Sequence, residues 1–242
     1  MRNPALLSVA LLSFVAACSS SSAPTTEQDK GLAGDNGASL APDTNPDGKP
    51  YPTDNIGTNP STHKSSGQVG ARGQRLANYK FLGYPEGNAE AGLKPVSMAN
   101  FYDPEGKRYK LIMIQAAGVW CSVCKTEMSY KQGIADALKA QGVALITTLA
   151  EGSKGGEPAV ETDLVGWANR YKTNYPQLLD PGNKNLGVFY DAAALPWNAY
   201  VDARTMEILS AGVGLDAQNA EGVKKNAEQW LKWLEKNSAA VQ

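Results

Sequence analysis

Two cysteines three residues apart, Cys121 and Cys124, are the side chains in this sequence best suited to chemistry. Two sulfur atoms at this spacing can close a disulfide, and the apolar pattern predicts a helix that begins at Cys121. Unpaired backbone N–H groups and the helix dipole stabilise a thiolate at such a position. We therefore expect Cys121 to be exposed and to attack a disulfide, and Cys124 to be held back and to resolve the mixed disulfide.

Two other uses of this cysteine pair are weaker. A zinc site needs further ligands, and the sequence has no second cysteine pair and no histidine nearby, so we expect no metal. The single histidine, His63, lies in a polar stretch far upstream, where a structural or incidental role is the simpler interpretation. A purely structural disulfide would close a very short loop, which stabilises a fold little.

The third cysteine, Cys18, ends an apolar run over residues 5–17 that follows one positive charge at Arg2. The run is shorter than the about 20 residues that span a bilayer, and small residues precede Cys18, as in a secretory signal. The sequence from Val15 to Cys18 resembles a bacterial lipobox, which implies that residues 1–18 are a lipoprotein signal peptide and that Cys18 carries the lipid. An ordinary signal peptide with an incidental Cys18 is the alternative.

This N-terminal segment sets the expected location. A lipid anchor would hold the chain at the periplasmic face of a bacterial membrane, within the cell envelope. Serines rather than aspartate follow Cys18, which slightly favours the outer membrane. The mature chain then keeps only Cys121 and Cys124, and a redox pair suits an oxidising compartment.

Composition limits which partners, cofactors and ordered segments the rest of the chain can have. The net charge of −1 argues against a basic surface, so we expect no nucleic-acid partner. Residues 19–66 are rich in Ser, Pro, Gly, Asn, Asp and Thr, which predicts a disordered tether between the membrane and a folded domain over residues 67–242. No glycine-rich phosphate loop precedes a helix, so we expect no cofactor.

Hydrophobic patterning predicts the elements that position the cysteines. A continuous apolar run at residues 111–114 indicates a strand buried on both faces, which would deliver the cysteine pair to the carboxyl edge of a sheet. Further strands are expected over residues 79–84, 96–102, 143–149, 175–179, 197–201 and 207–212, and helices over residues 121–140, 160–171 and 217–237. Alternating strands and helices followed by a hairpin predict an α/β fold with a mixed sheet and helices on both faces.

Residues 70–238 resemble the thioredoxin superfamily, and more narrowly the TlpA-like bacterial thiol–disulfide oxidoreductases. The resemblance rests on Trp120 before the cysteine pair, Glu127 three residues after it, Leu195-Pro196 before the hairpin and Gly214 after it. It implies a thioredoxin-like three-layer fold, with a central mixed β-sheet flanked by helices and an N-terminal strand extension. It also implies a cis peptide bond before Pro196, for which an ordinary trans turn is the alternative.

Three positions around the cysteines have expected supporting roles. Gln115 stands where the family often has Asp or Asn, and its amide cannot take a proton. Glu127 is then the remaining candidate for proton handling near Cys124, although a glutamate on a helix can also simply face solvent. Trp120 is expected to shield the disulfide and to shape the docking surface.

These features predict a membrane-anchored thiol–disulfide oxidoreductase that acts as a reductant on disulfide-bearing exported proteins and draws electrons from a membrane electron donor. A thioredoxin-fold thiol peroxidase is the first alternative, but residues 115–121 lack the proline and threonine that precede a peroxidatic cysteine. A copper-delivery protein of the Sco type would need a wider cysteine spacing and a distant histidine. A non-catalytic lipoprotein is the last alternative, against which the intact Trp120, Cys121 and Cys124 argue.

Overall fold

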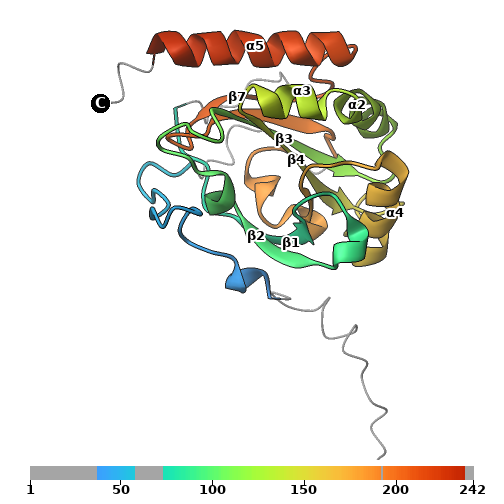
Figure 1. Cartoon of the computed structure of the whole chain (residues 1–242). Coiled ribbons are helices and arrows are strands. Elements are labelled where there is room, and N and C mark those ends of the chain that lie inside the picture. The colour runs from blue at the N-terminus through green and yellow to red at the C-terminus, as the bar shows by residue number, and fades with distance from the viewer. Residues whose placement is uncertain (1–36, 58–72, 192, 238–242) are drawn as a thin grey trace, which may run out of the picture.

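The computed structural model describes residues 37–57, 73–191 and 193–237, and its centre is a mixed sheet. Seven strands lie in the order β2-β1-β5-β4-β3-β6-β7. The strands are β1 (Lys80–Tyr84), β2 (Lys94–Ser97), β3 (Leu111–Gly118), β4 (Val143–Glu151), β5 (Gln177–Leu179), β6 (Trp197–Asp202) and β7 (Ile208–Val213). The helices, labelled as in Figure 1, are α2 (Ser122–Gln132), α3 (Ala135–Ala140), α4 (Glu161–Tyr171) and α5 (Ala220–Asn237). Short 3₁₀ segments are η1 (Ala38–Leu40), η3 (Ala89–Ala91), η4 (Met98–Phe101), η5 (Pro181–Asn183) and η6 (Leu186–Val188).

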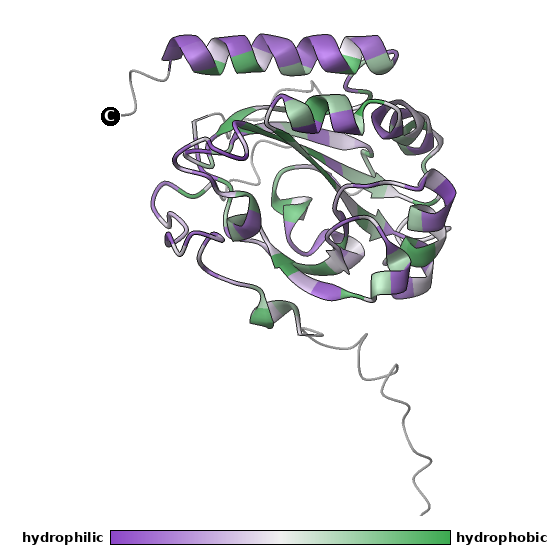
Figure 2. Cartoon of the chain, viewed as in Figure 1, coloured by the Kyte–Doolittle hydropathy of each residue, from purple (hydrophilic) through white to green (hydrophobic). Residues whose placement is uncertain are grey.

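Strand directions confirm the predicted mixed sheet. The central strand β4 lies parallel to β3 and to β5, whereas β6 and β7 continue the sheet in antiparallel pairs. The β1–β2 hairpin is the expected N-terminal strand extension, and β1 joins it to β5. Every residue of β3 is buried, as the apolar run predicted, and every residue of the neighbouring β4 is buried as well. Figure 2 shows β3 as an apolar ribbon inside the molecule, whereas much of α5 is hydrophilic.

Different elements cover the two faces of the sheet. Figure 1 shows α2, α3 and α5 together on one side of it. The side chain of Asn198 in β6 contacts α2, so the preceding Trp197 points to the opposite face. There, Phe189 and Tyr190 stack on Trp197 with ring centroids 5.6 and 5.3 Å away. The apolar residues of α5 that pack inward are Val223, Ala227, Leu231 and Leu234.

The single helix predicted over residues 121–140 is two helices. Helix α2 ends before Gly133, and α3 begins after Ile134, whose backbone has φ −121° and ψ 0°. Glycine is a poor helix former, so the chain can turn there at small cost. The break lets Ile134 and Leu138 reach the core, where both are buried.

The strand predicted over residues 96–102 is shorter than expected. Strand β2 ends at Ser97, and the chain turns at once into η4. The Asn100 side-chain oxygen accepts a hydrogen bond of 2.8 Å from the Ser97 backbone N–H, which closes this turn. Such local side-chain to backbone bonds compete with strand pairing, and here the local bond prevails.

The disordered tether predicted over residues 19–66 is wrong for residues 37–57. Tyr51 is buried in the domain core, and its hydroxyl donates a hydrogen bond to the Leu76 carbonyl. The η1 turn lies against β1 and β2 (Figure 1). A polar segment without a core of its own can be ordered in this way, because the folded domain supplies the apolar contacts and the hydrogen-bond partners.

Several predictions lie outside the described residues. These are the signal peptide over residues 1–18 with the lipidated Cys18, the remainder of the tether, which includes His63, and the domain boundary at residue 67. They stay predictions. Within residues 37–57, 73–191 and 193–237, no helix is both long and apolar enough to span a bilayer.

Candidate active site

Cys121 and Cys124 form a disulfide at the end of β3, where the chain enters α2. Their Cα atoms are 5.3 Å apart. Cys121 is the N-cap of α2, and the Cys124 backbone N–H donates a hydrogen bond of 3.0 Å to the Cys121 sulfur. The predicted placement of both cysteines in the first helical turn is therefore confirmed. This N–H is one of the unpaired donors of a helix start, and it would stabilise a thiolate on Cys121 after reduction.

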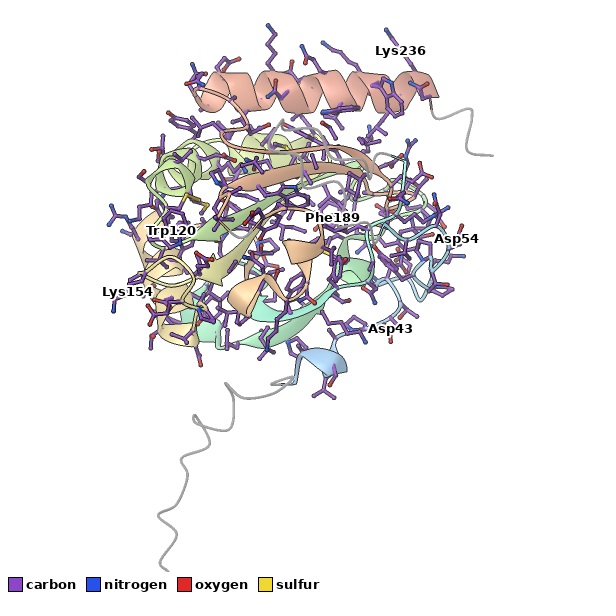
Figure 3. The ribbon with its side chains drawn as sticks, turned by 180° about the vertical axis from the view of Figure 1, so that it is seen from behind. Asp43, Asp54, Trp120, Lys154, Phe189 and Lys236 are labelled. Atoms are coloured by element: carbon purple, nitrogen blue, oxygen red, sulfur yellow. A yellow bond between two sulfur atoms is a disulfide. The ribbon has the colours of Figure 1, made fainter. Side chains whose placement is uncertain are left out.

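The exposure predicted for Cys121 is wrong in this oxidised form. Cys121 is 2% exposed and Cys124 is fully buried. Exposed apolar side chains lie beside them instead, with Trp120 36% and Val123 39% exposed. Figure 3 shows the disulfide near Trp120 at one side of the molecule. In this form the disulfide is therefore covered, and the exposed surface at the start of α2 is made by Trp120 and Val123.

Trp120 is fixed by β4 and by the loop that follows it. Its indole N–H donates a hydrogen bond to a carboxylate oxygen of Glu151, the last residue of β4. Its backbone N–H donates to the Gly152 carbonyl at 3.1 Å. A Cβ on Gly118 would lie 2.9 Å from the indole nitrogen, so the indole needs a glycine at this position. Sequence reasoning missed Glu151, although Gly118 and Glu151 are partners in the β3–β4 register.

Pro196 follows a cis peptide bond, as the resemblance implied. The preceding Leu195 is 9% exposed, and a Cβ on Gly118 would approach its side chain to 3.2 Å. Leu195 and Pro196 therefore lie beside the segment that carries Trp120 and the cysteines. The Gly214 N–H donates to the Pro196 carbonyl at 2.8 Å, and the positive φ of Gly214, 101°, favours glycine there.

Gln115 lies in a row of buried polar side chains that crosses four strands. The register pairs Gln177 with Thr147, Thr147 with Gln115, and Gln115 with Asn198. Paired residues of neighbouring strands share a face, and Thr147 contacts Met128 of α2 through its hydroxyl, so this face lies under α2. The Gln115 amide has no hydrogen-bond partner among the described residues.

Glu127 is fully buried, so the solvent-facing alternative for this residue is wrong. One carboxylate oxygen pairs with the Lys131 ammonium at 2.6 Å. The other accepts a hydrogen bond of 2.9 Å from the Asn198 amide and one of 3.3 Å from the Asp216 backbone N–H. Of these partners, only Lys131 has a signal in the sequence, because residues four apart meet on one face of a helix.

A second buried carboxyl group belongs to this cluster. Burial raises the pKa of Asp216 above its ordinary value, although the Tyr200 hydroxyl and the Lys131 ammonium oppose this shift. Tyr200 donates a hydrogen bond to the Asp216 carboxylate, and burial also raises the pKa of Tyr200. Across the described ranges, no three His, Cys, Asp or Glu side chains are grouped so that they could hold a metal ion.

Comparisons with known proteins show the fold. The chain is similar to a candidate protein disulfide isomerase from Bacteroides thetaiotaomicron (TM-score 0.53, 19% identity, covering 73% of this chain and 98% of that one). It is also similar to Enterococcus faecalis AhpC (TM-score 0.52, 18% identity, covering 69% and 96%). A third similar structure is a candidate thiol:disulfide interchange protein DsbE from Chlorobium tepidum (TM-score 0.50, 14% identity, covering 66% and 97%).

The chain therefore has the thioredoxin-like fold that the sequence motifs implied. No protein-family model matches the sequence, and no curated protein sequence matches it.

Proposed function

We propose that this chain is a thiol–disulfide oxidoreductase that exchanges disulfides with exported proteins through Cys121 and Cys124. The observation that carries the proposal is the disulfide between these residues at the start of α2, directly after the β3 residue Gly118 that lies against Leu195. Two cysteines so placed can pass between disulfide and dithiol, because the helix start stabilises the thiolate that reduction produces on Cys121. Similar solved structures support only the fold, so the proposal rests on this geometry.

Each round of disulfide exchange forms as many bonds as it breaks and conserves electrons. In the reduced protein, the Cys121 thiolate attacks one sulfur of a partner's disulfide, and the other partner sulfur leaves as a thiolate. Cys124 then loses its proton and attacks the Cys121 sulfur, which reforms the Cys121–Cys124 bond and breaks the bond to the partner. The partner's disulfide is reduced to two thiols, and the cysteine pair is oxidised.

The surface around the disulfide suits a protein partner. Five large hydrophobic side chains are exposed among the described residues, and Trp120, Val123 and Val213 are three of them. Trp120 and Val123 flank Cys121 in the sequence. Val213 pairs in register with Trp197, the residue after Pro196. Trp120 and Val123 would contact apolar residues near a partner's cysteine, since exposed apolar side chains beside a reactive group favour protein binding.

The location, the substrates and the direction of electron flow in this proposal come from the sequence. Lipidation at Cys18 would anchor the chain in the cell envelope and place the domain at the periplasmic face of the membrane. There, disulfide-bearing exported proteins are the available substrates, and a membrane electron donor would return the pair to the dithiol form. In this proposal the protein works as a reductant.

Reduction of a protein disulfide by a dithiol donor tests the function. The full-length protein should accelerate the reaction, and Cys121→Ser should abolish the acceleration. Ser122→Ala changes the neighbouring residue but keeps both sulfur atoms, so it should retain activity as the matched control. Acceleration that survives Cys121→Ser would overturn the proposal. Rapid consumption of peroxide with no exchange activity would favour the thiol peroxidase instead.

A further inference from the structure

A cavity of about 280 Å³ lies at the edge of the sheet where β3 and β4 begin. Its apolar wall is made by Val96 of β2, Phe101 of η4, Tyr109 before β3, and Val143 and Leu145 of β4. The ring centroids of Phe101 and Tyr109 are 6.2 Å apart. This volume is near the low end of the about 300–1,000 Å³ of ligand pockets, so the cavity suits a small ligand with an apolar body.

The cavity is separate from the cysteine pair. Val143, at the cavity, is the first residue of β4, and Glu151, which holds the Trp120 indole, is the last. A strand rises about 3.3 Å per residue, so these two ends of β4 are roughly 25 Å apart. A ligand in the cavity therefore does not touch the disulfide, and its binding does not depend on the proposed disulfide exchange.

The segment over residues 37–57 completes the rim of the cavity. Pro46 lines the cavity, and it lies in a turn that the Asn45 side chain closes. The Asn45 side-chain oxygen accepts hydrogen bonds from the backbone N–H groups of Asp47 at 3.0 Å and Lys49 at 2.8 Å. Its amide nitrogen donates to the Tyr102 carbonyl at 3.1 Å, directly after η4. Asn45 is buried, so these bonds fix the turn, and with it Pro46, on the domain.

Positive charge prevails at this cavity. Arg108 and Lys139 both line it, whereas Glu86 is the one carboxylate among the described residues that do so. Arg108 reaches Asp47 only at 3.4 Å, and such an exposed pair contributes little. The Lys139 ammonium, which is exposed on α3, pairs with no carboxylate of the described residues. Both cations are therefore available to an anionic group of a ligand.

We propose that this cavity binds a small aromatic carboxylate. The ring of the ligand would lie against Phe101 and Tyr109, because aromatic side chains bury flat apolar groups well. Its carboxylate would face Arg108 and Lys139, which can donate charge-assisted hydrogen bonds to it. A neutral aromatic molecule would keep the first contact and lose the second, so charge on the ligand should decide its affinity.

Titration of the isotope-labelled full-length protein with hydrocinnamate, followed by backbone amide chemical shifts, tests the proposal. The shifts of Phe101, Tyr109 and Val143 should change and saturate, while those of Cys121 and Cys124 should not change. The amide of the same acid has the same ring and no charge. It should bind about 25-fold more weakly, because it loses two exposed charge contacts of about 5-fold each.

Two charge-removing variants locate the anion subsite. Lys139→Met and Arg108→Gln should each raise the dissociation constant of hydrocinnamate about 5-fold, the upper range for an exposed charge pair. The double variant should raise it about 25-fold, and none of the three should change binding of the amide. Lys225→Met removes an exposed lysine of α5 that does not line the cavity, and as the matched control it should bind hydrocinnamate as the wild type does.

Three results would overturn the proposal: no saturable shift change at the cavity residues, equal affinity for hydrocinnamate and its amide, or unchanged affinity in the double variant. Arg108→Gln also removes a cation that lies 5.9 Å from the centre of the Tyr109 ring. If that variant does not fold, an unchanged affinity in Lys139→Met, which alters an exposed side chain, overturns the proposal equally. Disulfide exchange plays no part in the titration, so failure here leaves the proposed function as it stands.

Discussion

Gly118 is the position at which one methyl group should disturb the candidate active site. A Cβ there would lie 2.9 Å from the Trp120 indole nitrogen and 3.2 Å from a Leu195 methyl carbon. Ordinary contacts of a Cβ begin at 3.4 Å, so the indole must move by about half an ångström. That movement strains the hydrogen bond between the indole N–H and Glu151. We expect Gly118→Ala to lower the free energy of unfolding by about 1–3 kcal/mol, the usual cost of overpacking.

Gly155→Ala is the matched control, because it also adds a methyl group that faces Trp120. Its Cβ would lie 3.8 Å from the indole, which is an ordinary contact. In thermal unfolding, Gly118→Ala should lower the midpoint by about 2–4 °C for each kcal/mol lost, and Gly155→Ala should leave it nearly unchanged. The disulfide-exchange rate should also fall only in Gly118→Ala. Equal behaviour of the two variants would refute the placement of Trp120 over Gly118.

Two further predictions concern residues away from the cysteines. Tyr51→Ala should lower the free energy of unfolding by about 3–5 kcal/mol, because it removes a buried ring, and an unchanged urea midpoint would show that residues 37–57 do not pack on the domain. Burial raises the pKa of Asp180 above 3.8, so the native state keeps this proton longer than the unfolded state does. The stability from this group is therefore fully present below the unfolded pKa of 3.8, and it is lost as pH rises through the folded pKa. Urea unfolding across pH should show this fall in the wild type and not in Asp180→Asn.

The sequence predicts those parts of the site that are encoded locally. Cys121, Cys124 and Trp120 follow a continuous apolar strand, and the bond before Pro196 precedes a recognisable hairpin, so motif and spacing suffice to place them. The order of strands and helices predicts the mixed sheet for the same reason, since both periodicities are properties of short segments.

Tertiary contacts explain what the sequence could not show. Asn198 is 71 residues from Glu127, and nothing in either local pattern indicates that their side chains meet. Glu151 reaches Trp120 only because β3 and β4 lie parallel in a particular register. Residues 37–57 have a disordered composition, yet Tyr51 finds its partners in the domain rather than in its own segment.

In the proposed reaction, Cys121 attacks the partner and Cys124 resolves the mixed disulfide. The most direct measurement traps that intermediate by peptide mass mapping after the full-length protein reacts with a disulfide-bearing protein. Cys124→Ser should accumulate a covalent adduct on Cys121 that a reductant releases, and Cys121→Ser should accumulate none. An adduct on Cys124, or no adduct in Cys124→Ser, would contradict this account.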